Sequence, residues 1–225
     1  MTLFKFTNKS FNFFYLINVS FICLMVLSFN GTVSAASPPP SINLTPKDLD
    51  DITRVEDYMN QIQTLKARFQ QYSPDSGIAF GTIYIKRPGR MRVEYEPPSA
   101  VVLIADGSLV SYYDREIDEL SQAPLSSTPA WFLVRDPVSL TKDVTITAIE
   151  RAPGALRIAL YQTKEPDAGS VELIFSDKPL ELKQWAIVDP NGKETRVGLF
   201  GSSIGSELPD SLFERPEKKS GRKRN

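Results

Sequence analysis

Hydrophobic and polar residues alternate in short runs over most of the chain after residue 60, and this pattern predicts a β-protein. The clearest runs lie between residues 80 and 113, where they flank the turns 86–90 and Asp106-Gly107. Alternation places every second side chain on the same face of a sheet, and tight turns of this kind join neighbouring antiparallel strands. Four strands are therefore predicted here, at 83–85, 91–95, 101–105 and 109–113.

The pattern continues on both sides of this stretch, with turn-forming residues such as Asn191-Gly192 between the runs. A strand about every ten residues, without a change of composition that would mark a second domain, is typical of a meander that curls into a barrel. We expect a mainly β (α+β) fold, an incomplete and strongly curved antiparallel β-barrel of about eleven strands. The remaining strands are predicted at 65–70, 117–122, 144–149, 156–161, 171–175, 180–188 and 195–200.

Two segments have helical features instead. Thr45, Pro46 and Asp48 are typical of a helix start, because threonine can cap the first turn, proline suits the first position and the acid completes a capping box. Apolar residues then recur at spacings of three and four up to Ile62, so this helix has one apolar side. We expect it to dock on the sheet, with a mobile lid as the alternative. A second, short and strongly apolar helix is predicted at 130–134.

Residues 1–36 predict a secretory signal peptide. Lys5 and Lys9 precede a long apolar run, and small residues follow it, so we expect cleavage near Ala35 and Ala36. The apolar run is nearly long enough to cross a bilayer, which makes an uncleaved anchor the alternative. The predicted parts of the exported chain are a proline-rich leader at 37–44, a domain at 45–216 and a basic flexible tail at 217–225. For the tail, contact with anionic lipid headgroups is the alternative to free solvation.

The composition excludes several kinds of chemistry. The chain of 225 residues has no histidine, and its single cysteine, Cys23, lies in the predicted signal peptide. The exported chain therefore cannot form a Ser-His-Asp triad, a Cys-His pair, a disulfide or an ordinary zinc site. The 225-residue chain has no phosphate-binding glycine loop, and its formal net charge of −1 without a basic stripe argues against nucleic acid. We expect no metal and no other cofactor.

Two groups of carboxylates remain as candidates for chemistry. A pair of carboxylates can hydrolyse glycosides, and the group in the predicted turn could also bind calcium, although it lacks the regular ligand spacing of a calcium loop. We interpret both groups as solvated charges. They are Asp48, Asp50 and Asp51 on the first predicted helix, and Asp114, Glu116, Asp118 and Glu119 in a predicted turn.

Several predicted strands have an apolar face that carries no reactive groups. Met91, Val93 and Tyr95 share one side of a strand, and Ile158 and Leu160 share one side of another. Taken alone, such faces favour an ordinary hydrophobic core, and a cavity for an apolar ligand is the alternative. Because the chain offers so little for catalysis, this apolar surface becomes the candidate site.

Four motifs carry a resemblance to a known family. They are residues 85–89 followed by Met91, the hairpin containing 104–107 and 112–114, Thr128-Pro129 before the short apolar helix, and, more weakly, 210–213 with Pro216. From about residue 49 to residue 216 the chain resembles the periplasmic outer-membrane lipoprotein carrier (LolA) family. The family often has an aromatic residue where this chain has Met91, a difference that concerns the fit of the cargo.

The resemblance implies an incomplete eleven-stranded barrel with two or three short helices as a lid over an apolar cavity. It implies a monomeric periplasmic carrier whose partners are acylated lipoproteins, an inner-membrane ABC transporter that supplies them and an outer-membrane receptor where one exists. It also implies that Arg87 holds the lid closed by hydrogen bonds to lid backbone. The acyl-site and lid residues expected on this basis are Arg87, Met91, Val93, Tyr95, Trp131, Phe132, Leu133, Ile158 and Leu160.

Two other classes of protein remain as alternatives. Similar domains occur in envelope-stress sensors or scaffolds, which would bind lipid or lipoprotein without transporting it. An enzyme acting on envelope glycans is the third possibility, and it is disfavoured by the absence of histidine and by the lack of a convincing carboxylate pair. We therefore expect a carrier and not an enzyme.

Overall fold

The computed structural model describes residues 39–216. The chain divides into two units, Met1–Ala36 and Ser37–Asn225, and all of the described residues belong to the second. The predicted signal peptide and the predicted basic tail lie outside the described residues. Among the helices of residues 39–216, none has both the length and the apolar character needed to cross a membrane.

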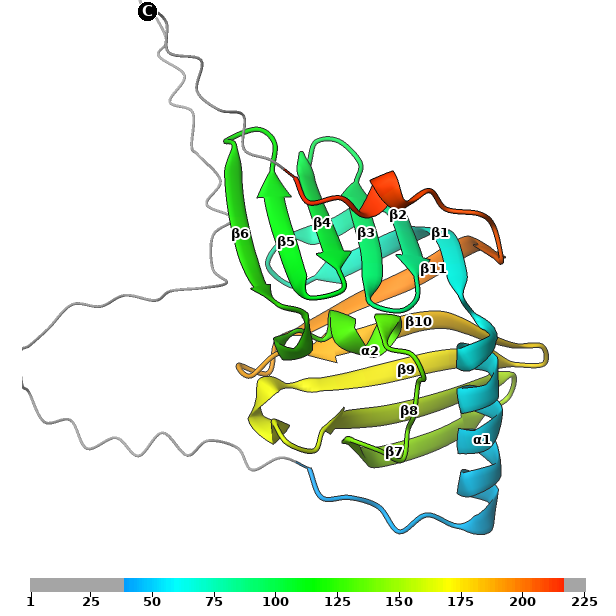
Figure 1. Cartoon of the computed structure of the whole chain (residues 1–225). Helices are drawn as coiled ribbons and strands as arrows, with labels where there is room; N and C mark the ends of the chain where they lie inside the picture. The colour runs from blue at the N-terminus through cyan, green and yellow to red at the C-terminus, as the bar shows by residue number, and fades with distance from the viewer. Residues whose placement is uncertain (1–38, 217–225) are drawn as a thin grey trace, which may run out of the picture. The chain divides into compact units, whose positions relative to one another are not determined.

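The described residues contain a single antiparallel sheet of eleven strands, as the hydrophobic pattern predicted. The chain runs outward from β1 to one edge at β6, crosses to the opposite edge at β7, and returns to the centre, where β11 pairs with β1. The sheet curves strongly, but its edge strands β6 and β7 do not pair, so the barrel is incomplete (Figure 1). The strands are β1 (Thr64–Ser73), β2 (Gly77–Lys86), β3 (Arg90–Tyr95), β4 (Val101–Asp106), β5 (Leu109–Asp114), β6 (Glu119–Pro124), β7 (Val144–Ala152), β8 (Ala155–Gln162), β9 (Ser170–Asp177), β10 (Leu180–Val188) and β11 (Glu194–Ile204).

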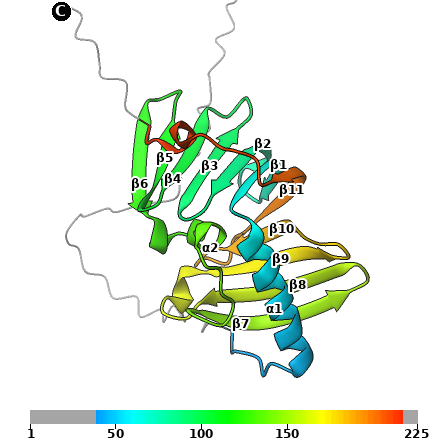
Figure 2. The ribbon, with the colours of Figure 1, turned by 45° about the vertical axis from the view of Figure 1, so that its right-hand side comes forward.

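Two α-helices lie against the concave side of the sheet, α1 (Pro46–Gln61) and the short α2 (Ala130–Val134) (Figures 1 and 2). Helix α1 begins with the predicted capping box, in which Thr45 N–H donates to the Asp48 carboxylate at 2.8 Å and Asp48 N–H donates to Thr45 Oγ1 at 3.3 Å. Its apolar side is buried in the main core, which confirms that the helix docks on the sheet. Three short 3₁₀ turns complete the elements, η1 (Leu125–Ser127), η2 (Pro166–Ala168) and η3 (Asp210–Phe213).

The alternation predicted the buried face of most strands correctly, and a bulge explains where it was ambiguous. In β10 the pairing with β9 shifts between Leu182 and Gln184, so one extra residue is inserted in β10. Leu182 and Trp185, three positions apart, are therefore both buried in the main core. The strand predicted at 117–122 begins two residues later, because Asp118 adopts a left-handed turn conformation with φ of 53°.

The opposite, convex side of the sheet carries a smaller apolar cluster, formed by Val102, Ile104 and Tyr113. The segment after β11 crosses this side, with η3 against β3 and β4 and the Phe213 side chain buried. Asp210 holds the segment in place, because it accepts hydrogen bonds from Lys86 and Arg90, each at 2.6 Å. The sheet thus has an outer core of its own, separate from the concave interior that holds the candidate site.

Gly81 in β2 lies between Phe69 and Tyr95, its cross-strand neighbours, whose rings meet edge to face 5.3 Å apart. A Cβ atom at Gly81 would overlap the Glu94 carbonyl oxygen and lie 2.5 Å from the Phe69 ring. We expect Gly81→Ala to lower the free energy of unfolding by about 2 kcal/mol, measured by urea denaturation. Gly198→Ala is the matched control, because its Cβ would meet nothing closer than 3.7 Å. Equal losses in the two variants would contradict the assigned packing.

Candidate functional site

The residues expected at the acyl site come together on the concave side of the sheet. Met91 and Val93 lie on β3 and Ile158 and Leu160 on β8, in opposite halves of the sheet, and all four are buried in the main core. Phe132 and Leu133 of α2 are buried in the same core, while Tyr95 and Trp131 are half-buried and pack against it. These eight side chains therefore belong to one continuous apolar cluster between the sheet and the helices.

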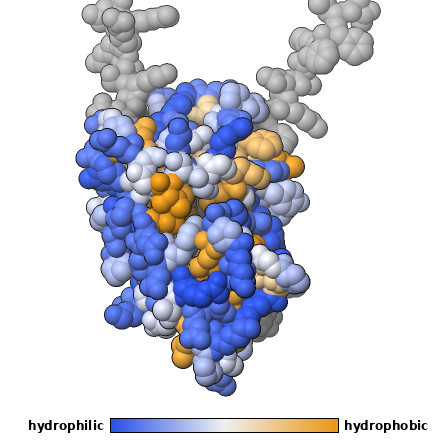
Figure 3. Space-filling view, turned by 90° about the vertical axis from the view of Figure 1, so that its right-hand side faces the viewer, coloured by the Kyte–Doolittle hydropathy of each residue, from blue (hydrophilic) through white to orange (hydrophobic). Residues whose placement is uncertain are grey.

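The apolar face is closed in this structure. The side chains of α1, α2 and the sheet fill the interior, and the pocket beside Trp131 and Leu160 has a volume of about 30 Å³. That space suffices for about one or two water molecules and is far smaller than an acyl chain. The face of the molecule turned to the viewer in Figure 3 is mostly hydrophilic, with small and separate hydrophobic areas. The surface expected to line a cavity is thus a packed core here, covered by two helices.

Arg87 lies in the turn between β2 and β3, and only 8% of its surface is exposed. Its Nε donates to the Leu133 carbonyl oxygen at 3.0 Å. Its Nη1 donates to the carbonyl oxygen of Met59 and, at 3.2 Å, to that of Ile62. Leu133 belongs to α2, while Met59 and Ile62 form the end of α1, so one guanidinium connects the C-terminal ends of both helices.

The charge of Arg87 is balanced by carbonyl groups. Within residues 39–216, no carboxylate forms an ion pair with this guanidinium. The carbonyls at a helix C-terminus carry partial negative charge, which favours a cation there. Burial nevertheless lowers the pKa of Arg87 to about 10, with nearby Asp136 acting in the opposite direction. The side chain remains charged at neutral pH, and opening the helices would return it to water.

The turn that carries Arg87 is fixed on both sides. Gly89 N–H donates to the Val134 carbonyl oxygen of α2 at 2.8 Å. On the other side, a Cβ atom at Gly89 would lie 2.7 Å from the Gly107 Cα atom in the next turn, and the φ of Gly89 is 78°. Both the close approach and the left-handed conformation require glycine. The two glycine turns found in the sequence therefore pack together and position Arg87.

Two polar residues of α1 bind the segment that follows α2, and sequence reasoning did not identify them. Asn60 Nδ2 donates to the Val138 carbonyl oxygen at 3.0 Å, and Val138 N–H donates to Asn60 Oδ1 at 2.7 Å. Glu56 accepts a hydrogen bond from Leu140 N–H at 2.5 Å. The two residues are four positions apart and so lie on one side of the helix, which is the signal that could have suggested a shared partner. They join α1 to the α2 segment.

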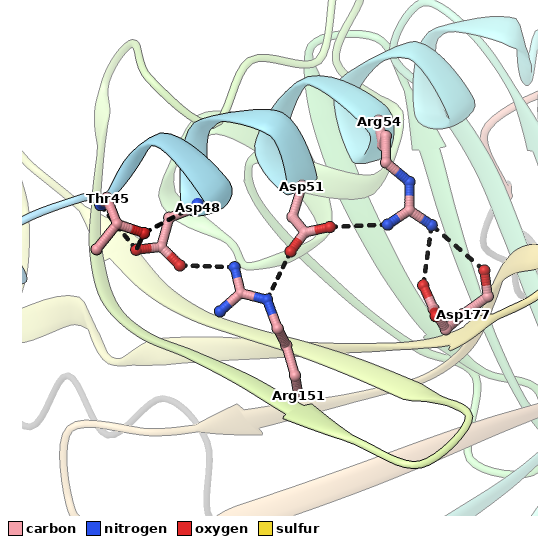
Figure 4. Close-up of polar contacts among 6 residues, drawn as sticks. All are labelled: Thr45, Asp48, Asp51, Arg54, Arg151 and Asp177. Atoms are coloured by element: carbon pink, nitrogen blue, oxygen red, sulfur yellow. Dashed lines mark hydrogen bonds and ion pairs between the residues drawn. The ribbon is translucent and has the colours of Figure 1, made fainter.

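The other end of α1 is held by charged residues, shown in Figure 4. Arg151, near the end of β7, donates to Asp48 at 2.6 Å through Nη2 and to Asp51 at 2.7 Å through Nε. Arg54 binds Asp51 at 2.7 Å and reaches Asp177 at the end of β9 at 2.9 Å. Hydrogen bonds from Thr45 and Arg151 lower the pKa of Asp48 to about 2. We call Asp48, Asp51, Arg54, Arg151 and Asp177 the N-terminal clasp.

The interpretation of the carboxylates as solvated charges is wrong for Asp48 and Asp51, which are buried beside their arginine partners. Arg151 could not be matched to them from the sequence, since it lies 103 and 100 positions away. In the second group, Asp114 accepts a hydrogen bond from Glu116 N–H and Asp118 accepts one from Tyr113 Oη, each at 2.8 Å. Across residues 39–216, no three His, Cys, Asp or Glu side chains gather closely enough to hold a metal ion.

These features define a class of protein. The described residues form an incomplete antiparallel barrel, whose apolar concave face is packed beneath two helices joined through one buried arginine. Residues 60–216 match the sequence model of the family described as outer membrane lipoprotein carrier protein LolA. The chain belongs to this family, which confirms the resemblance drawn from the sequence motifs.

Relatives with the same description span nearly the same length. The outer-membrane lipoprotein carrier protein of Azotobacter vinelandii is 28% identical over 182 residues, which cover 76% of this chain and 87% of that protein. The protein of the same description from Pseudomonas syringae pv. syringae is 27% identical over 177 residues, covering 74% of this chain and 84% of that protein. A solved LolA superfamily protein from Nitrosomonas europaea aligns with a TM-score of 0.43 at 10% identity, over 73% of this chain and 97% of that one.

Proposed function

We propose that this protein carries acylated lipoproteins through the periplasm, accepting them from an inner-membrane ABC transporter and delivering them to the outer membrane. Export would follow from the predicted signal peptide, with cleavage near Ala35 and Ala36. Family membership supports the lipoprotein cargo. The structural observation that carries the proposal is the position of Arg87, which binds the backbone of both covering helices over an apolar interior.

Acyl chains are more stable in an apolar interior than in water. Each buried CH₂ group is worth about 0.8 kcal/mol, so a lipoprotein with its acyl chains exposed would not leave a membrane unaided. In our proposal the chains replace the helices as the partner of the concave face, in contact with Met91, Val93, Tyr95, Ile158 and Leu160. Trp131, Phe132 and Leu133 would then cover the bound chains from the α2 side. One apolar contact would be exchanged for another, so little free energy separates the closed and loaded states.

A carrier must release its cargo as readily as it takes it up. The hydrogen bonds of Arg87 exist only when α1 and α2 cover the face, so they favour the closed and empty state. Acyl burial favours the loaded state. We propose that the balance of these two terms allows a membrane or a receptor to remove the cargo, and that Arg87 sets this balance.

Mass spectrometry of the natively purified protein tests the proposed function. We expect a mixture of triacylated lipoproteins, since the interior recognises acyl chains and not one protein sequence. The control is the same purification from cells that produce a secreted protein of similar size and charge. A single bound signalling protein would instead favour the sensor alternative, and an absence of any lipidated cargo would contradict the carrier.

A further inference from the structure

Only the C-terminal end of α1 is connected through a short linker to a strand of the sheet. Ile62 and Gln63 alone separate its last residue from β1, so its C-terminal end cannot move far without unpairing β1 from its neighbours. Its N-terminal end follows the leader, whose described part makes one backbone hydrogen bond to the sheet, from Ile42 N–H to the Ile146 carbonyl oxygen at 3.2 Å. If α1 moves off the concave face, its N-terminal end is the end that is free to swing.

The N-terminal clasp lies at this free end and reaches two different hairpins. Arg151 extends from the β7–β8 hairpin, and Asp177 lies where β9 turns into β10. Both hairpins belong to the half of the sheet that carries Ile158 and Leu160. The clasp therefore joins the swinging end of α1 to the part of the sheet that it covers (Figure 4).

We propose that the N-terminal clasp is a latch on α1, and that its release lets the helix pivot about Ile62 and Gln63 and uncover the concave face for cargo. This inference rests on the proposed carrier function. In the closed protein the clasp and Arg87 hold opposite ends of α1. Arg87 lies at the pivot, where it also binds α2, whereas the clasp holds the end that travels farthest.

The apolar contacts of α1 cannot act as the latch by themselves. Acyl chains would cover the same concave face equally well, so these contacts do not distinguish the closed state from the loaded one. The ion pairs that join α1 to Arg151 and Asp177 exist only while α1 is docked, and they therefore contribute to the closed state alone. This difference makes them suited to decide when the helix moves.

The electrostatic environments of the two ends differ. At the clasp each charge has a partner of opposite sign, and hydrogen bonding raises the pKa of Arg54 and Arg151 while it lowers that of Asp48. The arginine side chains remain 44% and 30% exposed, so water and salt reach the clasp. At Arg87, by contrast, burial lowers the pKa. The clasp is thus a set of favourable ion pairs at the edge of the interior, where solvent can reach it.

The test compares Arg151→Met with Arg157→Met by hydrogen exchange of the exported protein. Arg157 is an exposed arginine of β8 that makes no hydrogen bond or ion pair within residues 39–216, so its replacement removes a charge from the same hairpin without touching the clasp. We expect amides of α1 to exchange about tenfold faster in Arg151→Met, with the sheet unchanged. We also expect a synthetic triacylated lipopeptide to associate several-fold faster.

Equal α1 exchange in the two variants would overturn the latch. If Arg151→Met also raises exchange in the sheet, Asp177→Ala decides, because it removes the side-chain acceptor of the outermost ion pair of the clasp. Unchanged α1 exchange in that variant overturns the proposal. The carrier function fails separately. Suppose that neither the original protein nor any variant binds the lipopeptide, but breaking the clasp still speeds the exchange of α1 amides. The clasp then holds the helix, and the proposed carrier function is wrong.

Discussion

Arg87→Leu is expected to retain lipoprotein cargo and to slow its delivery at least tenfold. The substitution removes the donor shared by the carbonyl groups of Met59, Ile62 and Leu133. In the closed state these carbonyls would face an apolar side chain, whereas in the open state they reach water. Met59 keeps the Ile62 N–H as a donor, so the carbonyls of Ile62 and Leu133 are the two that lose the Arg87 hydrogen bond without this replacement. Each buried carbonyl without a partner costs about 1–3 kcal/mol, so we expect the closed state to lose about 3 kcal/mol relative to the open one. Cargo would then be bound more tightly and released more slowly.

The measurement is the transfer of a fluorescent triacylated lipoprotein from the loaded carrier to outer-membrane vesicles. Arg90→Leu is the matched control, because Arg90 lies three positions along the same turn but its side chain pairs with Asp210 on the convex side. Arg87→Lys should behave in an intermediate way, since an ammonium group keeps the charge but not the geometry of the guanidinium fork. Normal release from inner membrane and normal delivery by Arg87→Leu would rule out the role assigned to Arg87.

The strands and hairpins of the sheet were predictable because the residues that specify each of them are close together in the sequence. Alternation specifies which side of a strand is buried, and glycine turns specify where the chain reverses, so ten or more residues suffice for each hairpin. A feature that depends on how two strands pair is harder to predict from the sequence. The bulge at Leu182 is such a case, because only its pairing with β9 shows that one residue has been inserted. The capping box at Thr45 was predictable for the opposite reason, since all of its atoms lie within four residues.

The contacts that hold the helices were not predictable from the residues alone. An arginine in a turn is by default exposed to solvent, and only the family resemblance suggested that Arg87 binds lid backbone. Nothing in the sequence indicated the clasp. The pattern of α1 places its aspartates on the polar side of the helix, and their arginine partner Arg151 comes from a hairpin distant in the sequence. Long-range polar contacts of this kind depend on how the sheet curves, and single-residue patterns do not encode that curvature.

In our proposal the packed core is also the cargo site. The sequence pattern favoured a core and the resemblance favoured a cavity, and the structure shows the packed core. The apolar face is covered by the protein's own helices, and these are joined to one another and to the sheet by a small number of polar groups. Those groups lie at the ends and along one side of α1, and in our proposal their release lets the helix leave the strands beneath it.

Met91→Glu is expected to destabilise the protein by several kcal/mol and to abolish lipopeptide binding. Met91 is 5% exposed and lies between Ile85 of β2 and Ala105 of β4, with its side chain in the main core. Its neighbours across the strands are apolar, so a carboxylate there would lose its hydration without gaining an ion-pair partner opposite it on β2 or β4. It would have to take up a proton or force the helices away from the face, and in either case the site would no longer suit acyl chains.

Urea denaturation and titration with the triacylated lipopeptide measure the two effects. Met91→Leu should retain binding and lose less than about 1.5 kcal/mol, because it keeps the volume and the apolar character of the side chain. Gln70→Glu adds the same charge to the half-exposed outer side of β1 and should leave both quantities nearly unchanged. If Met91→Glu instead matches Gln70→Glu in stability and in lipopeptide uptake, Met91 does not face the interior, and the concave face of β3 cannot be the acyl-binding surface.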